Sequence, residues 1–382
     1  MARLPLLKRL NERTVLETIR AGAPISRAEI SRRAGISKPT VSLALRSLVE
    51  SGLVREAVER PDGPGYGAVY FEPVPEAALV LGLDLGARFL RGAICDLNGT
   101  IRARQDVELD GADAERALGA VADLRDALVA ATGLSDDLID GVVVGVPGVT
   151  GAGDGTLQLA ANVPGLEGRP FRAELQARLG LPITLENDIN LAALGERRLG
   201  VARGVDDFVF LSVGTGMGAG IVLGGELHRG RHGFAGEIDF ALEPLEEDVD
   251  PSAPQVAEVA ARAAGEHPGT TLRPPYDARS VFDAARAGDD AARLVVAEVA
   301  RRIAHHLAPV AAVVDVELVV LGGGIGSNGD LLLEPVRRLL AEWLPFPPRV
   351  EVSTVGEAAV LAGALAVGVR EALDNVAVRE VA

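Results

Sequence analysis

Apolar positions in the first part of the chain recur at the three- and four-residue spacing of helices and then change to the alternation of strands. In the first helical segment, Val15, Leu16 and Ile19 share one face. Gly22 and Pro24 follow directly, and both residue types end helices. The pattern therefore predicts an N-terminal helix that closes just before Pro24.

Capping residues predict two further short helices. Ser26 and Glu29 have the spacing of a capping box, and Gly35 predicts the end of this basic helix. Ser37 is the predicted N-cap of the next helix, which tolerates Pro39 in its first turn. Three short helices with a tight glycine turn before the third are typical of a helix-turn-helix, which presents the third helix to the major groove of DNA.

The segments LVREAVERP and YGAVYFEP are predicted to pair as the strands of a wing around Pro61–Gly65, so the winged helix covers about residues 9 to 72. On the third helix, Val41, Leu45 and Leu48 are expected to face the core. The opposite face leaves two interpretations open, a solvated interaction surface and a DNA-reading surface. For the second, the candidate DNA-binding residues are Ser37, Lys38, Thr40, Ser42 and Arg46.

Beyond Pro73 and Pro75, which predict a linker, strands alternate with helices. LVLGLDLG, FLRGAICDL and TIRARQDVEL read as consecutive strands, followed by a helix at about 113–131 and the strand GVVVGVPG. A similar order returns in FVFLSVG, GAGIVLG and the strand after Gly224 and Gly225, which indicates an internal duplication. Two such halves would close on a cleft at the carboxyl ends of their strands.

Candidate ligand-binding residues follow the apolar strands of both halves. Asn187 and Asp188 lie where a strand gives way to a helix, so they either cap that helix or bind vicinal hydroxyls of a ligand, with the carboxylate as a possible base. Glu237 is a second carboxylate for the same ligand. Glycine-rich turns, which bring backbone N–H groups close to a phosphate, contain Asp84, Gly86, Gly214, Thr215, Gly216, Gly323 and Gly324.

The distribution of charge assigns nucleic-acid binding to one end of the chain. The net charge of −16 over 382 residues argues against a polyanionic partner. Residues 1–60, however, contain 12 Lys and Arg against 6 Asp and Glu, so this segment carries +6 and the remainder −22. Cys95 is the single cysteine, which excludes an internal disulfide and a Cys-cluster zinc site. Without an apolar run of about 18 residues, we expect a soluble, cytoplasmic protein with no membrane partner.

Several segments, in this order, resemble the ROK family (repressors, open reading frames, kinases), specifically its members with an N-terminal winged helix. They are LENDINLAALGE, LSVGTGMGAGIV with GFAGEI, and VLGGGIG with GEAAVLAGALA. The resemblance covers nearly the whole chain. It implies an α/β protein with a winged helix-turn-helix in 1–75 and a duplicated actin-like, RNase H-like (sugar-kinase) fold in 76–382, whose lobes span 76–195 and 196–382. It also implies that Asp188 matches the catalytic base of the kinases and that the sugar contacts are Asn162, Asn187 and Glu237, with Glu258 as a looser match.

Two departures from the kinase pattern argue against catalysis. Kinase members usually have Asp-x-Gly-Gly-Thr, whereas this chain has Ala87 and Arg88 at the last two positions, and these side chains are expected to intrude on the phosphate site. The family's zinc-binding His and Cys cluster is absent after Gly236–Phe240. We therefore expect no metal and no cofactor, with Asp188 as a vestigial base and the glycine turns as vestigial nucleotide loops.

These observations predict a sequence-specific transcriptional regulator, a repressor controlled by a sugar or sugar derivative in the cleft. Its expected partners are an inverted-repeat DNA operator, the sugar, and further copies of the chain in a homodimer or tetramer. One alternative is an active ATP-dependent sugar kinase with a DNA-binding appendage. Another is a DNA binder that responds to no sugar. Two features leave this alternative open: the absence of the zinc cluster, and the presence of Phe240 where the family has a histidine.

Overall fold

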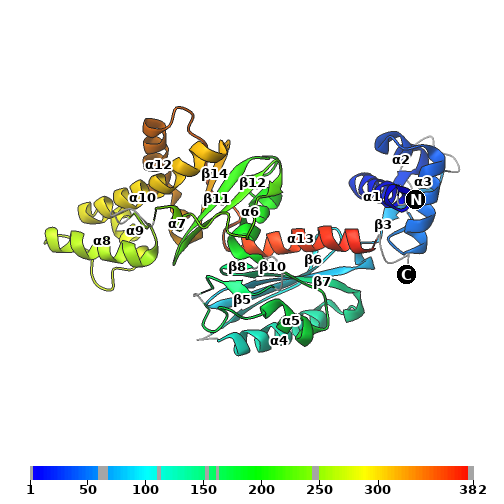
Figure 1. The fold of residues 1–382 in the computed structure, drawn as a ribbon, viewed down its shortest axis with the longest axis horizontal. Helices are drawn as coiled ribbons and strands as arrows, with labels where there is room; N and C mark the ends of the chain where they lie inside the picture. Colours follow the sequence, from blue (N-terminus) through cyan, green and yellow to red (C-terminus); the bar gives the residue numbers. More distant parts are fainter. Residues whose placement is uncertain are drawn as a thin grey trace.

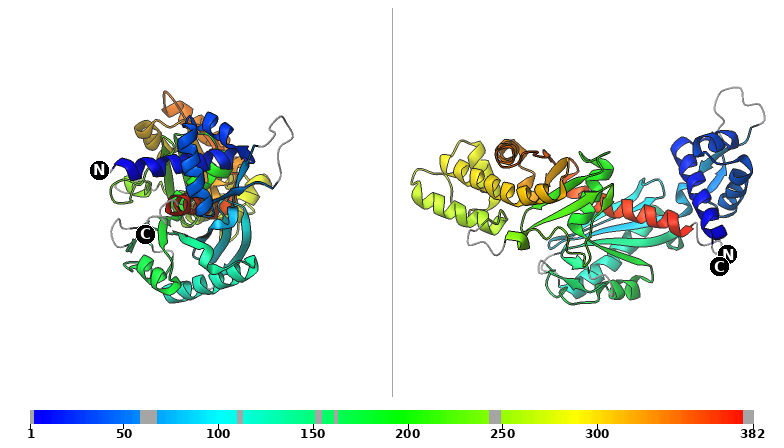
Figure 2. Two further views of the ribbon diagram at one scale, coloured as in Figure 1. Left: turned by 90° about the vertical axis from the view of Figure 1, so that its right-hand side faces the viewer. Right: turned by 45° about the horizontal axis from the view of Figure 1, so that its top comes forward.

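The computed structural model describes residues 3–58, 68–109, 113–150, 155–160, 163–242 and 249–376. Three units lie along an elongated molecule, with the winged helix at one end and the two lobes beside it (Figures 1 and 2). Within these ranges, no helix is both long and apolar enough to cross a membrane.

The winged helix begins with α1 (Arg3–Gly22), which ends at the predicted glycine. The Ser26 hydroxyl accepts a hydrogen bond from the Glu29 N–H (3.3 Å) at the start of α2 (Arg27–Ala34), and Gly35 ends this helix at a φ of 67°. The other half of the expected capping box is wrong. The Glu29 carboxylate accepts hydrogen bonds from the Arg32 and Arg33 guanidinium groups instead of the Ser26 N–H, because charge-assisted hydrogen bonds are stronger.

The predicted third helix is α3 (Lys38–Glu50), with the Ser37 hydroxyl as its N-cap. The wing strands β2 (Val54–Glu56) and β3 (Tyr70–Pro73) pair antiparallel, and the short β1 (Ile25–Ser26) joins the other edge of β3. This confirms the pairing expected for a wing. The turn predicted at Pro61–Gly65 lies outside the described residues.

Each lobe is built on a five-stranded mixed sheet, and the two sheets have the same topology. In both, the first three strands form an antiparallel meander, and two later strands add in parallel on the other side of the first strand. This repeat confirms the duplication. The first sheet has the order β10-β7-β4-β5-β6, with β4 (Leu79–Leu85), β5 (Phe89–Asp96), β6 (Ile101–Glu108), β7 (Ile139–Val146) and β10 (Ile183–Asn187). The second has the order β13-β12-β11-β14-β15, with β11 (Phe208–Val213), β12 (Met217–Leu223), β13 (Glu226–Leu227), β14 (Leu318–Gly322) and β15 (Arg349–Val352).

Helices cover both sheets, and each sheet has its own apolar core. A two-stranded ribbon of β8 (Val149–Thr150) and β9 (Leu157–Gln158) extends from the first lobe. The helices of the first lobe are α4 (Ala114–Thr132) and α5 (Phe171–Leu179), and α6 (Asp188–Leu199) follows β10. Those of the second lobe are α7 (Asp239–Leu242), α8 (Ala253–Glu266), α9 (Ala278–Arg286), α10 (Asp290–Val314), α11 (Gly323–Gly326) and α12 (Gly329–Trp343).

The last helix, α13 (Ala359–Val376), returns to the first lobe, where it packs on β4 and β7 and along α6. Its contact with α6 is made backbone to backbone. A Cβ on Gly195 would lie 2.1 Å from the Ala359 carbonyl oxygen, and one on Gly363 would lie 1.9 Å from that of Leu191. The expected assignment of 196–382 to the second lobe is therefore wrong for α13, because its apolar face is buried against the first sheet.

The winged helix is docked on the first lobe. Its core runs on into apolar residues of the lobe, including Cys95 and Leu361. The Arg20 guanidinium of α1 donates to the Leu97 carbonyl oxygen (2.6 Å), and the Leu97 N–H donates to the Pro75 carbonyl oxygen (3.0 Å). The predicted linker is thus a short 3-10 turn, Pro75–Ala77, held between the two units.

Candidate functional site

The outer face of α3 presents the predicted DNA-contacting side chains. Lys38 and Arg46 are exposed, and Leu43 between them is 65% exposed, whereas the opposite face of the helix is buried. The Ser42 hydroxyl donates to the Lys38 carbonyl oxygen (2.9 Å). The Ser37 and Thr40 hydroxyls bond each other at 2.8 Å, so both lie at the N-terminus of the helix, where a major groove would be entered.

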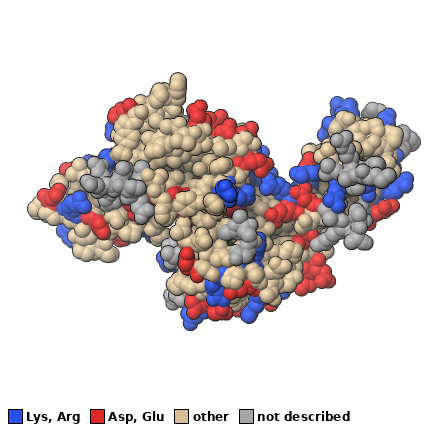
Figure 3. All heavy atoms as spheres, in the orientation of Figure 1, with Lys and Arg blue, Asp and Glu red and all other residues tan. Residues whose placement is uncertain are grey.

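The surface charge follows the division seen in the sequence. On the face drawn in Figure 3, Lys and Arg side chains gather over the winged helix, and Asp and Glu are spread over the lobes. The positively charged winged helix attracts the phosphate backbone of DNA, and the negatively charged lobes repel it. This distribution of charge orients the molecule with α3 toward DNA.

A second candidate site lies where the two lobes meet, and three predicted carboxylates come together there. Asp84 lies on β4, Asp188 at the start of α6, and Glu237 in the segment after β13. Burial, together with the charges of Asp84 and Glu237, raises the pKa of Asp188 to about 7. Burial likewise raises the pKa of Asp84 to about 6 and that of Glu237 above its ordinary value. Near neutral pH the Asp188 carboxyl is therefore present in both its protonated and its ionised form.

Asn187 acts as the helix cap that the sequence left as one alternative. Its side-chain oxygen accepts hydrogen bonds from the N–H groups of Ile189 (2.9 Å) and Asn190 (3.0 Å). Its amide nitrogen donates to the Gly148 carbonyl oxygen at 3.0 Å. This orientation fixes the start of α6, so Asn187 positions the neighbouring Asp188.

Beside this cap lies an ion pair that the sequence analysis missed. Glu186, buried at the end of β10, accepts a hydrogen bond from the Arg229 guanidinium at 2.6 Å. Its other oxygen accepts from the Asn190 amide at 2.9 Å. Because Arg229 follows β13 of the second sheet, the pair joins the two lobes next to Asp188. Nothing in the sequence around Glu186 indicates that it pairs with Arg229, because the two residues are 43 positions apart.

Arg91 is a further residue that the sequence analysis missed. It lies opposite Asp84 in the β4–β5 hairpin and approaches that carboxylate at 3.3 Å, with a second contact to Glu357 at 2.9 Å. The expected intrusion of Arg88 into the phosphate site is wrong. Its side chain is 79% exposed and lies over the Phe89 ring, 3.8 Å from Glu108, because the tight turn directs it outward. The turn that places residues 84 and 91 in register could have revealed Arg91.

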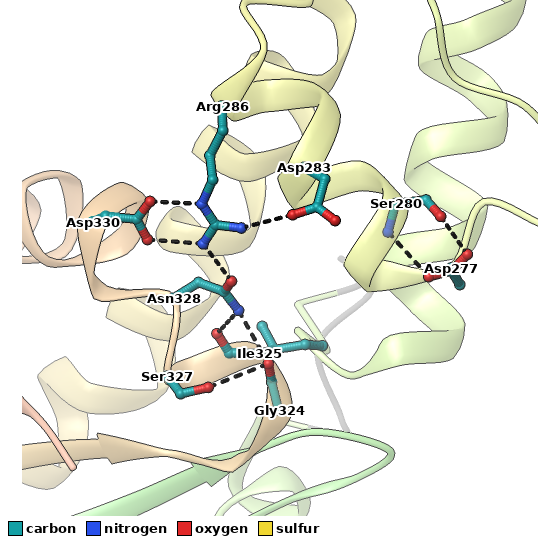
Figure 4. Close-up of polar contacts among 9 residues, drawn as sticks. All are labelled: Asp277, Ser280, Asp283, Arg286, Gly324, Ile325, Ser327, Asn328 and Asp330. Carbon is teal, nitrogen blue, oxygen red and sulfur yellow. Dashed lines mark hydrogen bonds and ion pairs between the residues drawn. The ribbon is translucent and has the colours of Figure 1, made fainter. Parts of the chain in front are cut away.

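The other two glycine turns lie against each other. The Gly214 N–H donates to the Gly216 carbonyl oxygen at 2.9 Å, and Gly323 has a φ of 77° with its α-carbon packed against Val213. Figure 4 shows how the third turn is held: Arg286 of α9 bonds Asp330 and the Asn328 side chain, whose amide in turn donates to the Gly324 carbonyl oxygen. A cavity of about 290 Å³ lies beside these residues.

Two predicted candidates remain, Asn162 and Glu258. Asn162 lies outside the described residues. Glu258 is exposed on α8, so its role stays a prediction. Phe240 lies where the family pattern has a histidine, and its ring is tilted against that of Phe234 with the centroids 5.3 Å apart. Within the described ranges, no group of His, Cys, Asp or Glu is arranged to hold a metal ion. The residues here do not fit the family's zinc site.

Comparison with known protein families gives a match for the winged helix and another for the two lobes. A model of the ROK family matches residues 80–371, and a model of the MarR family matches residues 7–63. The xylose repressor of Caldicellulosiruptor bescii is 28% identical over 97% of this chain and 98% of its own length. A glucokinase of Halalkalibacterium halodurans is 29% identical over 68% of this chain and 84% of that protein.

Two solved structures confirm the expected fold class. A ROK family transcriptional regulator, a homolog of the E. coli MLC protein, has a TM-score of 0.80 at 22% identity over 98% of both chains. A ROK family glucokinase from Streptomyces griseus, in complex with glucose and AMPPNP, has a TM-score of 0.63 at 28% identity over 76% of this chain and 99% of that one. Since the ROK model spans residues 80–371, well over half of the sequence, the chain belongs to the ROK family.

Proposed function

We propose that this protein is a DNA-binding transcriptional repressor whose operator affinity is set by a sugar bound between the lobes. The observation that carries the proposal is the union, in one chain, of an exposed basic recognition helix and a kinase-type lobe whose Asp84 is paired with Arg91. The near full-length likeness to proteins named xylose repressor supports the same function. The protein acts as a regulator and not as an enzyme.

The sugar is held by the carboxylates at the lobe junction. Asp188 and Glu237 are placed to accept hydrogen bonds from vicinal hydroxyls, and their raised pKa values also let them donate when protonated. Xylose is the first candidate, because relatives named xylose repressor match this chain over almost its full length. Xylopyranose has the same six-membered ring as glucopyranose but lacks its exocyclic hydroxymethyl group, so a preference for xylose would indicate that the site excludes this group.

Two helices connect the sugar site to the DNA-binding unit. α6 begins at Asp188 and contacts α13 backbone to backbone through Gly195 and Gly363, so neither helix can shift without the other. Near its end, α13 bonds Arg13 of α1 through Asp374 at 3.0 Å. A sugar that repositions the start of α6 would thereby change the placement of the winged helix.

The expected assembly is a homodimer or a tetramer of two dimers. Two-fold symmetry would set two α3 helices about 34 Å apart, or a multiple of that distance, and would require an inverted-repeat operator. Movement of α13 in both subunits would change this spacing and release the DNA.

The experiment is a footprint of the purified protein on the DNA upstream of its own gene and of neighbouring transport and catabolic genes. Each protected fragment is then titrated with xylose, glucose, ribose and their acidic derivatives. We expect one protected inverted repeat and a loss of affinity with one sugar, which disappears in Asp188→Ala while DNA binding without sugar persists. The proposal is overturned if no sugar changes either the operator affinity or the melting temperature.

An ATP-dependent sugar kinase is the second candidate, favoured by the nearly neutral pKa of Asp188 and by the outward direction of Arg88. Sugar-dependent ADP release, measured with the same sugars, discriminates the two functions. We expect none above background. Release that disappears in Asp188→Asn would establish the kinase in place of the pure regulator.

A further inference from the structure

A cavity of about 450 Å³ lies between the winged helix and the first lobe, away from the carboxylates of the sugar site. One wall is α1, the opposite wall is α13, and the end of α6 and the β5–β6 turn close the sides. Its volume is that of a small-molecule site. Most of the lining is apolar, and on α13 it includes Leu361, Leu365, Val369 and Leu373.

The charged lining residues are five arginines and two glutamates, so the cavity is positive overall. Three of the arginines already have carboxylate partners: Arg13 pairs with Glu17 and Asp374, Arg104 with Asp106, and Arg370 with Glu226. Among the described residues, the other two arginines, Arg20 and Arg198, form no ion pair, although the charges of Glu17 and Asp96 act on Arg20.

Arg20 and Arg198 both line the cavity, and they are close enough for their charges to interact. Arg20 donates from one terminal nitrogen to the Leu97 carbonyl oxygen, and its buried Nε has no hydrogen-bond acceptor among the described residues. Arg198 forms no hydrogen bond or ion pair within the same part of the chain. Burial and the charge of Arg198 lower the pKa of Arg20. A bound anion would relieve this repulsion.

We propose that this cavity binds a small amphipathic monoanion, a carboxylate with an unbranched or aromatic apolar body. The carboxylate lies between Arg20 and Arg198, and the apolar body lies along α13. A free sugar does not fit the apolar wall, because its hydroxyls would lose water without gaining partners. A second anionic group at the far end is disfavoured by the buried Glu12, which lies about 12 Å from Arg20 along α1.

The ligand would contact the DNA-binding unit and the lobe at once, so it would act as a wedge that fixes their relative placement. This site is independent of the sugar site and does not rest on the proposed function. Binding can be measured on the full-length protein without DNA and without sugar.

The test is isothermal titration of the full-length protein with decanoate, kept below its micellar concentration, and with decanol as the uncharged counterpart. We expect saturable binding of one decanoate per chain and at least about tenfold weaker binding of decanol. Arg198→Ala should weaken decanoate binding about tenfold or more. Arg338→Ala, which removes an exposed arginine on α12 outside the cavity, should leave it unchanged.

Val369→Trp supplies a second variant, because an indole on this wall fills the cavity without removing charge. We expect it to abolish decanoate binding while circular dichroism shows the same helix content as the wild type. Equal binding to the wild type, Arg198→Ala and Val369→Trp would mean nonspecific adsorption and would overturn the proposal. So would the absence of binding to the wild type, or a Val369→Trp protein that loses only its oligomeric state, since a second copy would then cover the cavity.

Discussion

The guanidinium of Arg13 on α1 lies 3.0 Å from the carboxylate of Asp374, close to the end of α13. The pair joins the DNA-binding unit to the helix that packs along α6, at whose start Asp188 lies. Both side chains are about half exposed, so the pair contributes little to stability. The pair matters because it joins α1 of the winged helix to α13 of the first lobe.

Asp374→Asn is therefore expected to separate the sugar response from DNA binding. The free energy of unfolding should change by less than about 1 kcal/mol, because an exposed ion pair is weak. The factor by which the effector sugar lowers operator affinity should fall severalfold, as measured by fluorescence anisotropy with labelled operator. Asp126→Asn, which removes an exposed carboxylate on α4, is the control and should keep the full factor. An unchanged factor in Asp374→Asn would show that coupling runs elsewhere.

Lys38→Ala and Arg46→Ala should weaken operator binding by about 1–3 kcal/mol where the side chain reads a base, or uniformly across sequences where it contacts phosphate. A phosphate contact also contributes close to one unit to the slope of log affinity against log salt, so titrations at several salt concentrations distinguish the two roles. Arg338→Ala changes the net charge equally but lies on α12 of the second lobe. If Lys38→Ala and Arg46→Ala bind the operator with the same affinity as Arg338→Ala, α3 does not contact the DNA.

Arg91 and Arg88 offer a matched comparison within one hairpin. The side chain of Arg91 is 16% exposed and that of Asp84 is 8% exposed, so Arg91→Ala leaves a buried carboxylate without its partner. We expect a loss of about 2–4 kcal/mol in the free energy of unfolding, reduced where Asp84 takes up a proton. Arg88→Ala should cost less than about 0.5 kcal/mol. The double variant Asp84→Asn, Arg91→Ala should regain most of the loss; a double variant as unstable as Arg91→Ala would assign the effect to packing.

The raised pKa of Asp188 predicts how stability depends on pH. The folded protein binds this proton more tightly than the unfolded chain, so ionisation of the group lowers stability as the pH rises from about 4, the unfolded value, through about 7. Asp188→Asn removes this penalty. Its stability relative to the wild type, from urea unfolding at pH 4.5 and 8, should therefore be greater at pH 8. An equal difference at both values would mean that Asp188 titrates normally.

The local structure was predictable because its causes are local. Capping at Ser26 and Ser37, the end of α1 at Gly22, and the strands of both lobes depend on side chains within a few residues of each other. The repeat of strand patterns was enough to predict the duplication, and the strand-to-helix junction was enough to indicate Asn187 and Asp188. The capping box at Glu29 was only half right, since Arg32 and Arg33 compete for the same carboxylate.

The sequence by itself therefore determined the order of elements, the third helix with its exposed basic residues, and the carboxylates that lie together at the lobe junction. The tertiary structure decided which groups meet: Arg91 with Asp84, Arg229 with Glu186, and α13 with the first sheet and α1. The hairpin register could have indicated the first of these contacts, whereas the other two join residues far apart along the chain that no periodicity or spacing brings together. They form because the burial of apolar surface brings these segments together. A charge that is buried in this way is stable only beside an opposite charge, so the buried carboxylates pair with the arginines next to them.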